Sequence, residues 1–181
     1  MKNILYAAIF ISLISCVKKQ DATSIIKQSI EASGGDRYAN SVIAFDFREH
    51  HYQIERNQGE WTMKRIKTDS NGTIADTYTK ASFSRIINDS AVYPPDSMIF
   101  KYQESINSVF YFALLPFKLD DPAVMAERLE DEAIEGKNYF KIEVRFKEEG
   151  GGEDFQDVFI YWFDQSDYSL DYLAYSYETD G

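Results

Sequence analysis

Residues 137–147 read KNYFKIEVRFK, and this stretch decides the fold class. Its side chains form two alternating sets, Phe140, Ile142, Val144 and Phe146 on one side and Tyr139, Lys141, Glu143 and Arg145 on the other. Because successive side chains of a strand point to opposite faces of a sheet, this period of two predicts a strand with one buried face. A triple-glycine loop and a later turn lead to further strands at 155–163 and 168–177, so antiparallel hairpins are expected.

The same period of two occurs nearer the N-terminus. Residues 42–56 alternate between apolar and polar side chains and predict one strand. Turn sequences that contain Asn and Gly then separate it from a second strand at 61–67 and a third around 74–79. These three strands are expected to form a meander, in which each strand pairs with the next.

Helical spacing occurs in three other places. Residues 21–33 predict a helix that ends at two glycines, and residues 96–115 predict a second helix between Pro95 and Pro116. A short helical turn is expected at 123–129. The order is therefore helix, three strands, helix, three strands. This order indicates an α+β protein in which a curved antiparallel sheet wraps over its helices.

The N-terminus predicts export and lipid attachment. Lys2 and the apolar residues 4–15 form a signal peptide that is too short to span a bilayer of about 30 Å. Leu13-Ile14-Ser15-Cys16 resembles the bacterial lipobox, in which a small residue precedes the cysteine whose thiol receives diacylglycerol. We expect cleavage before Cys16 and an acyl anchor, such as palmitate, on it. A plain signal peptide or a short buried helix is the alternative.

The expected domain organisation follows from this cleavage. Residues 1–15 are the signal peptide, 16–22 a lipidated tether and 23–181 a single domain. The chain ends on Asp180-Gly181, a dipeptide typical of hairpin turns. We therefore expect the domain to be truncated at its C-terminus.

Charge and cysteine content limit the partners and the chemistry. The chain has 19 basic and 30 acidic residues. Lys2 is the one charged residue in the segment that cleavage removes, so the mature chain has 18 basic and 30 acidic residues and a net charge of −12. Such a surface repels phosphate backbones, which excludes nucleic acid as a partner. Cys16 is the sole cysteine, so no intrachain disulfide is possible and no other thiol is available for catalysis or metal binding.

Four stretches carry a resemblance to a known family, and they are 44–48, 105–116, 161–164 and 170–173. Together with the signal peptide, its lipobox and the helix that ends in Gly34-Gly35, they are similar to an uncharacterised family of bacteroidetal lipoproteins. The wider fold implied is that of LolA and LolB, the lipoprotein carrier and receptor. It is an incomplete β-barrel with the N-terminal helix and a central helical segment packed on the concave side, and an apolar cavity between. LolA is unlipidated, so a lipidated chain resembles LolB or lipid-carrying lipoproteins more closely. The exposed apolar loop of LolB has no clear counterpart here.

No catalytic site, metal site or cofactor is predicted. His50 and His51 are adjacent on a predicted strand and point to opposite faces, so they cannot chelate one metal ion. Glu49 shares a face with His51, but no third ligand is apparent. The chain has no nucleophile elbow, and the glycines at 150–152 lie between acidic residues that repel phosphate.

The high aromatic content allows two interpretations. Tyrosine and phenylalanine number 13 each, and these side chains can simply fill the core. Alternatively, some of them line an apolar cavity between sheet and helices, which suits acyl chains or other apolar ligands. The residues expected to line such a cavity are Phe45, Phe47, Trp61, Phe110, Phe112 and Trp162.

The leading hypothesis is therefore a non-enzymatic envelope lipoprotein that binds or shuttles an apolar, lipid-like ligand in a half-barrel. We expect the periplasmic side of the outer membrane rather than the inner membrane, because Lys18 and Lys19 follow Cys16 in place of an acidic retention signal. One alternative is a structural or interaction lipoprotein with a solid core and unknown protein partners. Another is a hydrolase or aldolase with an unrecognised site.

Overall fold

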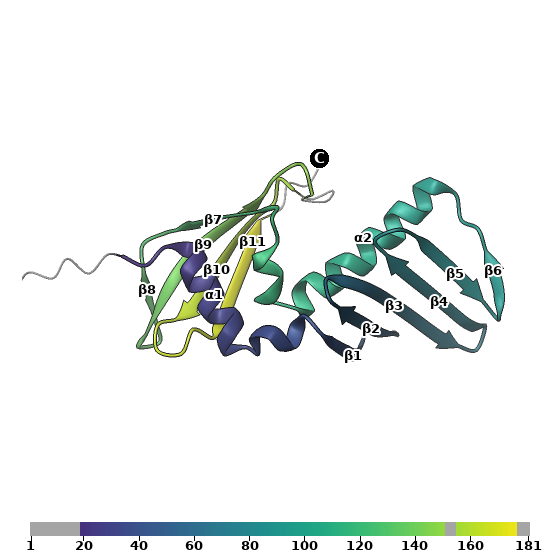
Figure 1. The fold of residues 1–181 in the computed structure, drawn as a ribbon, viewed down its shortest axis with the longest axis horizontal. Helices are drawn as coiled ribbons and strands as arrows, with labels where there is room; N and C mark the ends of the chain where they lie inside the picture. Colours follow the sequence, from purple (N-terminus) through teal and green to yellow (C-terminus); the bar gives the residue numbers. More distant parts are fainter. Residues whose placement is uncertain (1–18, 151–154, 177–181) are drawn as a thin grey trace, which may run out of the picture.

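The computed structural model describes residues 19–150 and 155–176. In this part of the chain, two α-helices and two antiparallel sheets form an α+β fold without a closed barrel (Figure 1). The α+β class predicted from the order of helices and strands is therefore confirmed. The strands are divided between two sheets, and each sheet has its own core.

The first sheet consists of six strands in sequence order, and each strand pairs antiparallel with the next. Short turns join neighbouring strands, as expected for a meander. The sheet continues beyond the predicted strands, because residues after 79 add two further strands. The strands are β1 (Ser41–Phe47), β2 (His50–Asn57), β3 (Glu60–Asp69), β4 (Gly72–Thr79), β5 (Phe83–Ile87) and β6 (Ser90–Val92).

The second sheet pairs its strands in the order β11-β10-β9-β7, with β8 beside β9. Every pairing is antiparallel, and at its centre Tyr161 lies opposite Ile142 on one side and Leu173 on the other. The strands are β7 (Val124–Arg128), β8 (Glu132–Ile134), β9 (Lys137–Phe146), β10 (Val158–Asp164) and β11 (Leu170–Ser176).

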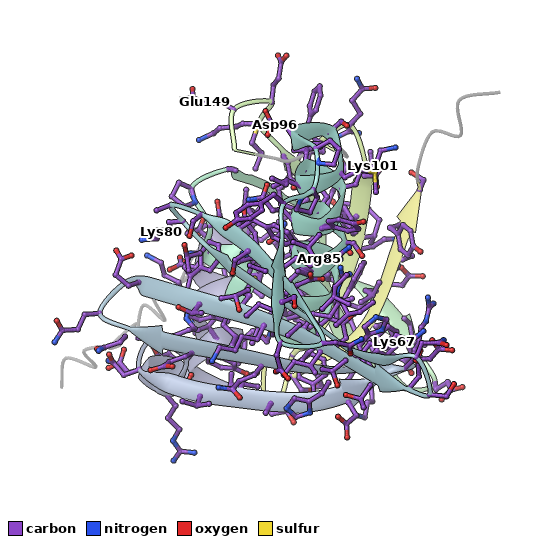
Figure 2. All side chains as sticks on the ribbon, turned by 90° about the vertical axis from the view of Figure 1, so that its right-hand side faces the viewer. Lys67, Lys80, Arg85, Asp96, Lys101 and Glu149 are labelled. Carbon is purple, nitrogen blue, oxygen red and sulfur yellow. The ribbon has the colours of Figure 1, made fainter. Side chains whose placement is uncertain are left out.

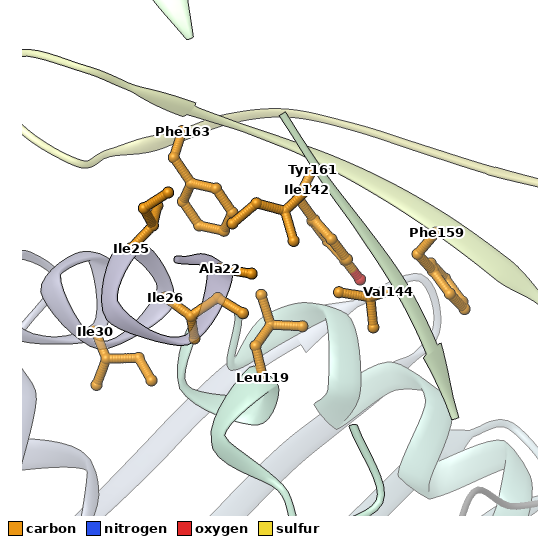
Figure 3. Close-up of a cluster of buried hydrophobic side chains, with 10 residues drawn as sticks. All are labelled: Ala22, Ile25, Ile26, Ile30, Leu119, Ile142, Val144, Phe159, Tyr161 and Phe163. Atoms are coloured by element: carbon orange, nitrogen blue, oxygen red, sulfur yellow. The ribbon is translucent and has the colours of Figure 1, made fainter. Parts of the chain in front are cut away.

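Helix α1 (Ala22–Ala32) packs across the second sheet (Figure 1). It begins after Asp21, whose carboxylate accepts a hydrogen bond from the Ser24 backbone N–H at 2.9 Å and so caps the helix. Its apolar side chains point toward those of β9 and β10 (Figure 3). The resulting second core consists of Ala22, Ile25, Ile26, Ile30, Leu119, Ile142, Val144, Phe159, Tyr161 and Phe163.

Helix α2 (Asp96–Ala113) starts at the outer end of the first sheet and runs along it toward the second sheet (Figure 1). Ile106, Phe110 and the following Leu114 are at most 1% exposed. They pack in the first core with side chains of β2 and β3, among them Tyr52 and Met63. This face of α2 therefore belongs to the first sheet.

The neighbouring face of the same helix belongs to the second sheet. Tyr111 and Leu115 pack against the second core. The Tyr111 and Tyr161 hydroxyls share a hydrogen bond of 2.6 Å. Burial raises the pKa of Tyr111 to about 12, so this bond stays between two neutral hydroxyls at ordinary pH. The short helix η2 (Phe117–Asp120) follows and leads into β7.

A buried ion cluster joins three strands of the first sheet to α2. Asp76 on β4 is 1% exposed and lies directly opposite Arg65 on β3 and Arg85 on β5. Its carboxylate accepts hydrogen bonds from Arg65 at 2.8 Å and from Arg85 at 2.7 Å. Arg65 also donates to the Ser105 hydroxyl at 2.9 Å, and the Arg85 guanidinium lies 3.5 Å from the centre of the Tyr102 ring. Figure 2 shows Arg85 beside α2.

Two elements differ from the sequence prediction. Residues 42–56 form two strands instead of one, because Arg48 adopts a positive φ of 55° and turns the chain between β1 and β2. Glycine or asparagine usually marks such a conformation, and neither is present. The helical turn expected at 123–129 is strand β7, whose residues pair with β9. The prediction also omitted β5, β6 and β8, of which the last two have three residues each.

Several predictions concern residues outside the described part of the chain. The signal peptide at 1–15, the lipid attachment at Cys16 and the turn at Asp180-Gly181 belong to this group. Among residues 19–150 and 155–176, no helix has both the length and the apolar composition needed to cross a membrane.

We expect Asp76→Asn to lower the free energy of unfolding by about 3–5 kcal/mol, because it leaves two buried guanidinium groups without their counter-charge. Urea denaturation followed by circular dichroism measures this change. Asp46→Asn is the matched control, since Asp46 pairs with His51 at an exposed site and its loss should cost less than about 1 kcal/mol. Equal effects of the two substitutions would contradict a structural role for the buried cluster.

Candidate functional site

A cavity of about 620 Å³ lies where the two sheets meet α2. The first sheet contributes Trp61, Met63 and Tyr78 to its wall, and the second sheet contributes Phe146, Phe159 and Tyr175. Helix α2 supplies a strip between them that consists of Glu104, Ser105, Asn107, Ser108, Tyr111 and Phe112. Because both sheets and the helix form the wall, the cavity depends on the fold as a whole.

Aromatic rings form most of the apolar wall, and they contact one another. On the first sheet, the Trp61 and Tyr78 rings meet edge to face, with centroids 4.9 Å apart. On the side of the second sheet, the centroid of the Phe159 ring lies 5.7 Å from that of Tyr111 and also 5.7 Å from that of Tyr175. Rings at these separations hold each other in place, so the wall is an ordered apolar surface.

Two basic side chains, Arg56 at the end of β2 and Lys118 on η2, line the same cavity. The Arg56 guanidinium lies 4.6 Å from the centre of the Phe117 ring, which stacks on Tyr38. Burial lowers the pKa of Arg56. Burial also lowers the pKa of Lys118, although the Asp121 carboxylate acts in the opposite direction, and repulsion from Arg56 lowers it further. Both cations are therefore partly removed from water.

The wall also includes three acidic residues, Glu104, Asp121 and Asp157. Asp121 is exposed, and its carboxylate accepts a hydrogen bond from the Ala123 backbone N–H at 2.9 Å. Glu104 lies near Tyr78, and the pKa of Tyr78 is raised by burial and then by this negative charge. The cavity thus combines apolar rings with charges of both signs.

The structure places the six aromatic residues predicted for a cavity in different surroundings. Trp61 and Phe112 line the cavity. Phe110 is fully buried in the first core, and Phe45 meets its ring edge to face at 5.7 Å. Phe47 is 45% exposed on β1, where Arg48 covers its ring.

The sixth residue, Trp162, lies on the other face of the second sheet. Its indole N–H donates to the Glu132 carboxylate at 3.0 Å, and the Lys141 ammonium lies 5.2 Å from its ring. Its neighbours Tyr161 and Phe163 point into the second core instead. Alternation along β10 explains this difference, since only every second residue can face the helices.

Sequence reasoning missed most of the residues that line the cavity. Tyr111 lines the cavity but was not predicted to do so, although Phe110 and Phe112 on either side of it were. Phe159 and Tyr175 are on strands that were predicted, but nothing in the alternation says which face meets α2. Nothing in the sequence marks Arg56 and Lys118 as cavity residues, because isolated basic residues usually lie on the surface.

The two histidines do not form a metal site. The His51 ring lies 2.7 Å from the exposed Asp46 carboxylate. His50 lies against the Tyr52 ring, and its pKa is lowered by burial and by the nearby Arg65. Within residues 19–150 and 155–176, no group of three His, Cys, Asp or Glu residues is arranged to hold a metal ion.

The fold and the cavity define an α+β protein in which two antiparallel sheets and a shared helix line an open site with aromatic walls. The chain belongs to a family of unknown function, DUF6503, whose model matches residues 2–181. No curated protein matches the chain. The family has no assigned activity, so the function has to be argued from the cavity.

We expect Lys118→Met to raise the free energy of unfolding at pH 7 by roughly 1 kcal/mol, because it removes a partly buried charge and keeps the apolar stem. The pKa of Lys118 is lower in the folded than in the unfolded protein, where it is about 10.5. The folded state therefore binds fewer protons between these two pKa values, and stability rises with pH across that range.

Below the folded pKa the cost of burying the charge is fully present, and above pH 10.5 it disappears. The stability difference between the variant and the wild type should therefore vanish above this pH. Urea denaturation from pH 7 to 11 checks this. Lys101→Met, at an exposed position of α2, is the control and should change stability by less than about 0.5 kcal/mol at every pH.

Proposed function

We propose that the protein is a membrane-anchored lipoprotein of the cell envelope that binds or shuttles an apolar, lipid-like ligand without catalysing a reaction. The observation that carries this proposal is the aromatic cavity of about 620 Å³ between the two sheets. Its size lies within the range of about 300–1,000 Å³ that is typical of small-molecule sites.

The chemistry of the cavity wall supports an apolar ligand. Rings such as Trp61, Phe112 and Phe159 offer large apolar surfaces, and Phe112 is 42% exposed although it is a large apolar residue. Each methylene group that moves from water onto such a surface contributes about 0.8 kcal/mol. A chain of about ten methylenes therefore gains roughly 8 kcal/mol before the costs of association are subtracted.

The proposed location rests on the N-terminal sequence. Residues 1–16 combine a signal peptide with a lipobox, and acyl chains on Cys16 would anchor the protein stably, because two or more such chains bury enough methylenes. A tethered protein whose cavity has an aromatic wall is suited to collect a lipid-like molecule at a membrane surface. We place it on the periplasmic side of the outer membrane.

We expect organic-solvent extraction of the purified protein, followed by mass spectrometry, to release a non-covalently bound apolar molecule. Ser108→Trp should reduce the amount released per protein severalfold, because Ser108 lines the cavity and the indole ring would occupy part of its volume. Lys101→Trp adds the same ring at an exposed position of α2 that does not line the cavity, and it should leave the yield unchanged. Wild-type protein that is always empty and binds no added apolar probe would refute the proposal.

We expect Cys16→Ser to abolish acylation and to move the protein from the membrane fraction to the soluble fraction of the cell envelope, since the thiol is the acceptor for the lipid. Intact-protein mass spectrometry and cell fractionation measure both effects. Ser15→Ala is the matched control, because it keeps a small residue before the cleavage site. An acylated, membrane-bound Cys16→Ser protein would contradict the assignment of the anchor.

A further inference from the structure

Arg56 has an incomplete set of hydrogen bonds at the cavity. Its Nε atom is buried, and no described residue accepts a hydrogen bond from it. The guanidinium rests on the Phe117 ring at 4.6 Å, which supports its flat face and leaves its edge for an acceptor. Buried donors in native proteins are nearly always paired, so an unpaired one in the wall of a cavity indicates a group that arrives from outside the chain.

Lys118 lies close enough to Arg56 for the two positive charges to repel each other. They come from different elements, β2 and η2, and both face the cavity. Two partly buried cations at one place are unfavourable unless a negative charge joins them. An anion beside both residues would remove the repulsion and give the Arg56 guanidinium a hydrogen-bond acceptor from outside the chain.

Among the acidic residues of the cavity, Asp121 attracts Lys118, but no carboxylate offsets the effect of burial on the pKa of Arg56. Burial is the one cause that shifts the pKa of Arg56, with no carboxylate opposing it. For Lys118, burial outweighs the attraction of Asp121, which is exposed and bonded to a backbone N–H. The negative charge of Glu104 raises the pKa of Tyr78, which belongs to the first sheet.

We propose that the ligand is an amphiphile with one anionic head group, a carboxylate or a phosphate, that binds between Arg56 and Lys118. Its apolar chain lies along the aromatic wall formed by residues such as Trp61, Tyr111 and Phe159. An arginine edge and a lysine ammonium together match the oxygens of either head group. This inference rests on the proposed function and adds the charge class of the ligand to it.

Isothermal titration calorimetry on lipid-stripped protein tests the inference with three ligands of equal chain length: decanoate, decyl phosphate and 1-decanol. The wild type should bind at least one of the two anions about tenfold or more tightly than the neutral alcohol, since hydrogen bonds to charged groups are the stronger ones. Arg56→Met and Lys118→Met should each remove most of this preference while affinity for 1-decanol is kept. Arg48→Met is the matched control, because Arg48 lies over Phe47 on the exposed end of β1.

The outcomes separate this inference from the function on which it rests. If the alcohol and both anions bind equally well, the head-group site is refuted and the apolar binding function stands. The same conclusion follows if Arg56→Met and Lys118→Met keep the full preference for an anion. If none of the three ligands binds, the proposed function fails as well. Circular dichroism melting curves of each variant exclude unfolding as the cause of a lost preference.

Discussion

The arrangement of the two sheets depends on the packing of one helix between two cores. Neighbouring side chains on an α-helix point about 100° apart, so Phe110 and Tyr111 can face different partners. Phe110 packs among the residues of the first sheet, and Tyr111 bonds to Tyr161 at the centre of the second. A helix that is apolar on two faces has to be covered by other elements on both of them. This requirement holds the sheets on either side of α2, and the cavity lies along the part of the helix between them, where Tyr111 contributes to both the second core and the cavity wall.

Local periodicity predicted much of this fold, and the errors occur where the decisive signal is tertiary. The alternation of residues 137–147 corresponds to β9, because this strand lies between two partners and has one face on the core. The turn at Arg48 was not predicted, because a residue other than glycine adopts the positive φ there. Residues 124–128 have a short pattern that fits a helical turn equally well, and their pairing with β9 makes them a strand.

The candidate site was less predictable than the fold, for a geometric reason. Alternation divides Tyr161 and Trp162 between two faces but does not say which face meets the helices. The cavity also draws its residues from eight helices and strands that are far apart in the sequence, and Arg56 and Lys118 are among these residues. A basic residue reveals itself as part of a site only when the structure shows that it is buried beside another one. Groups with shifted pKa values cluster at functional sites, which makes these two residues part of a candidate site.

The row of Arg65, Asp76 and Arg85 has a consequence for how the first sheet assembles. The three residues are direct partners on adjacent strands, so their charges alternate across the sheet. A slip of β4 by one residue would turn Asp76 to the opposite face and leave two arginines together without a carboxylate. The ion row therefore adds a penalty for misaligned strands to the one that the buried face of the sheet already imposes.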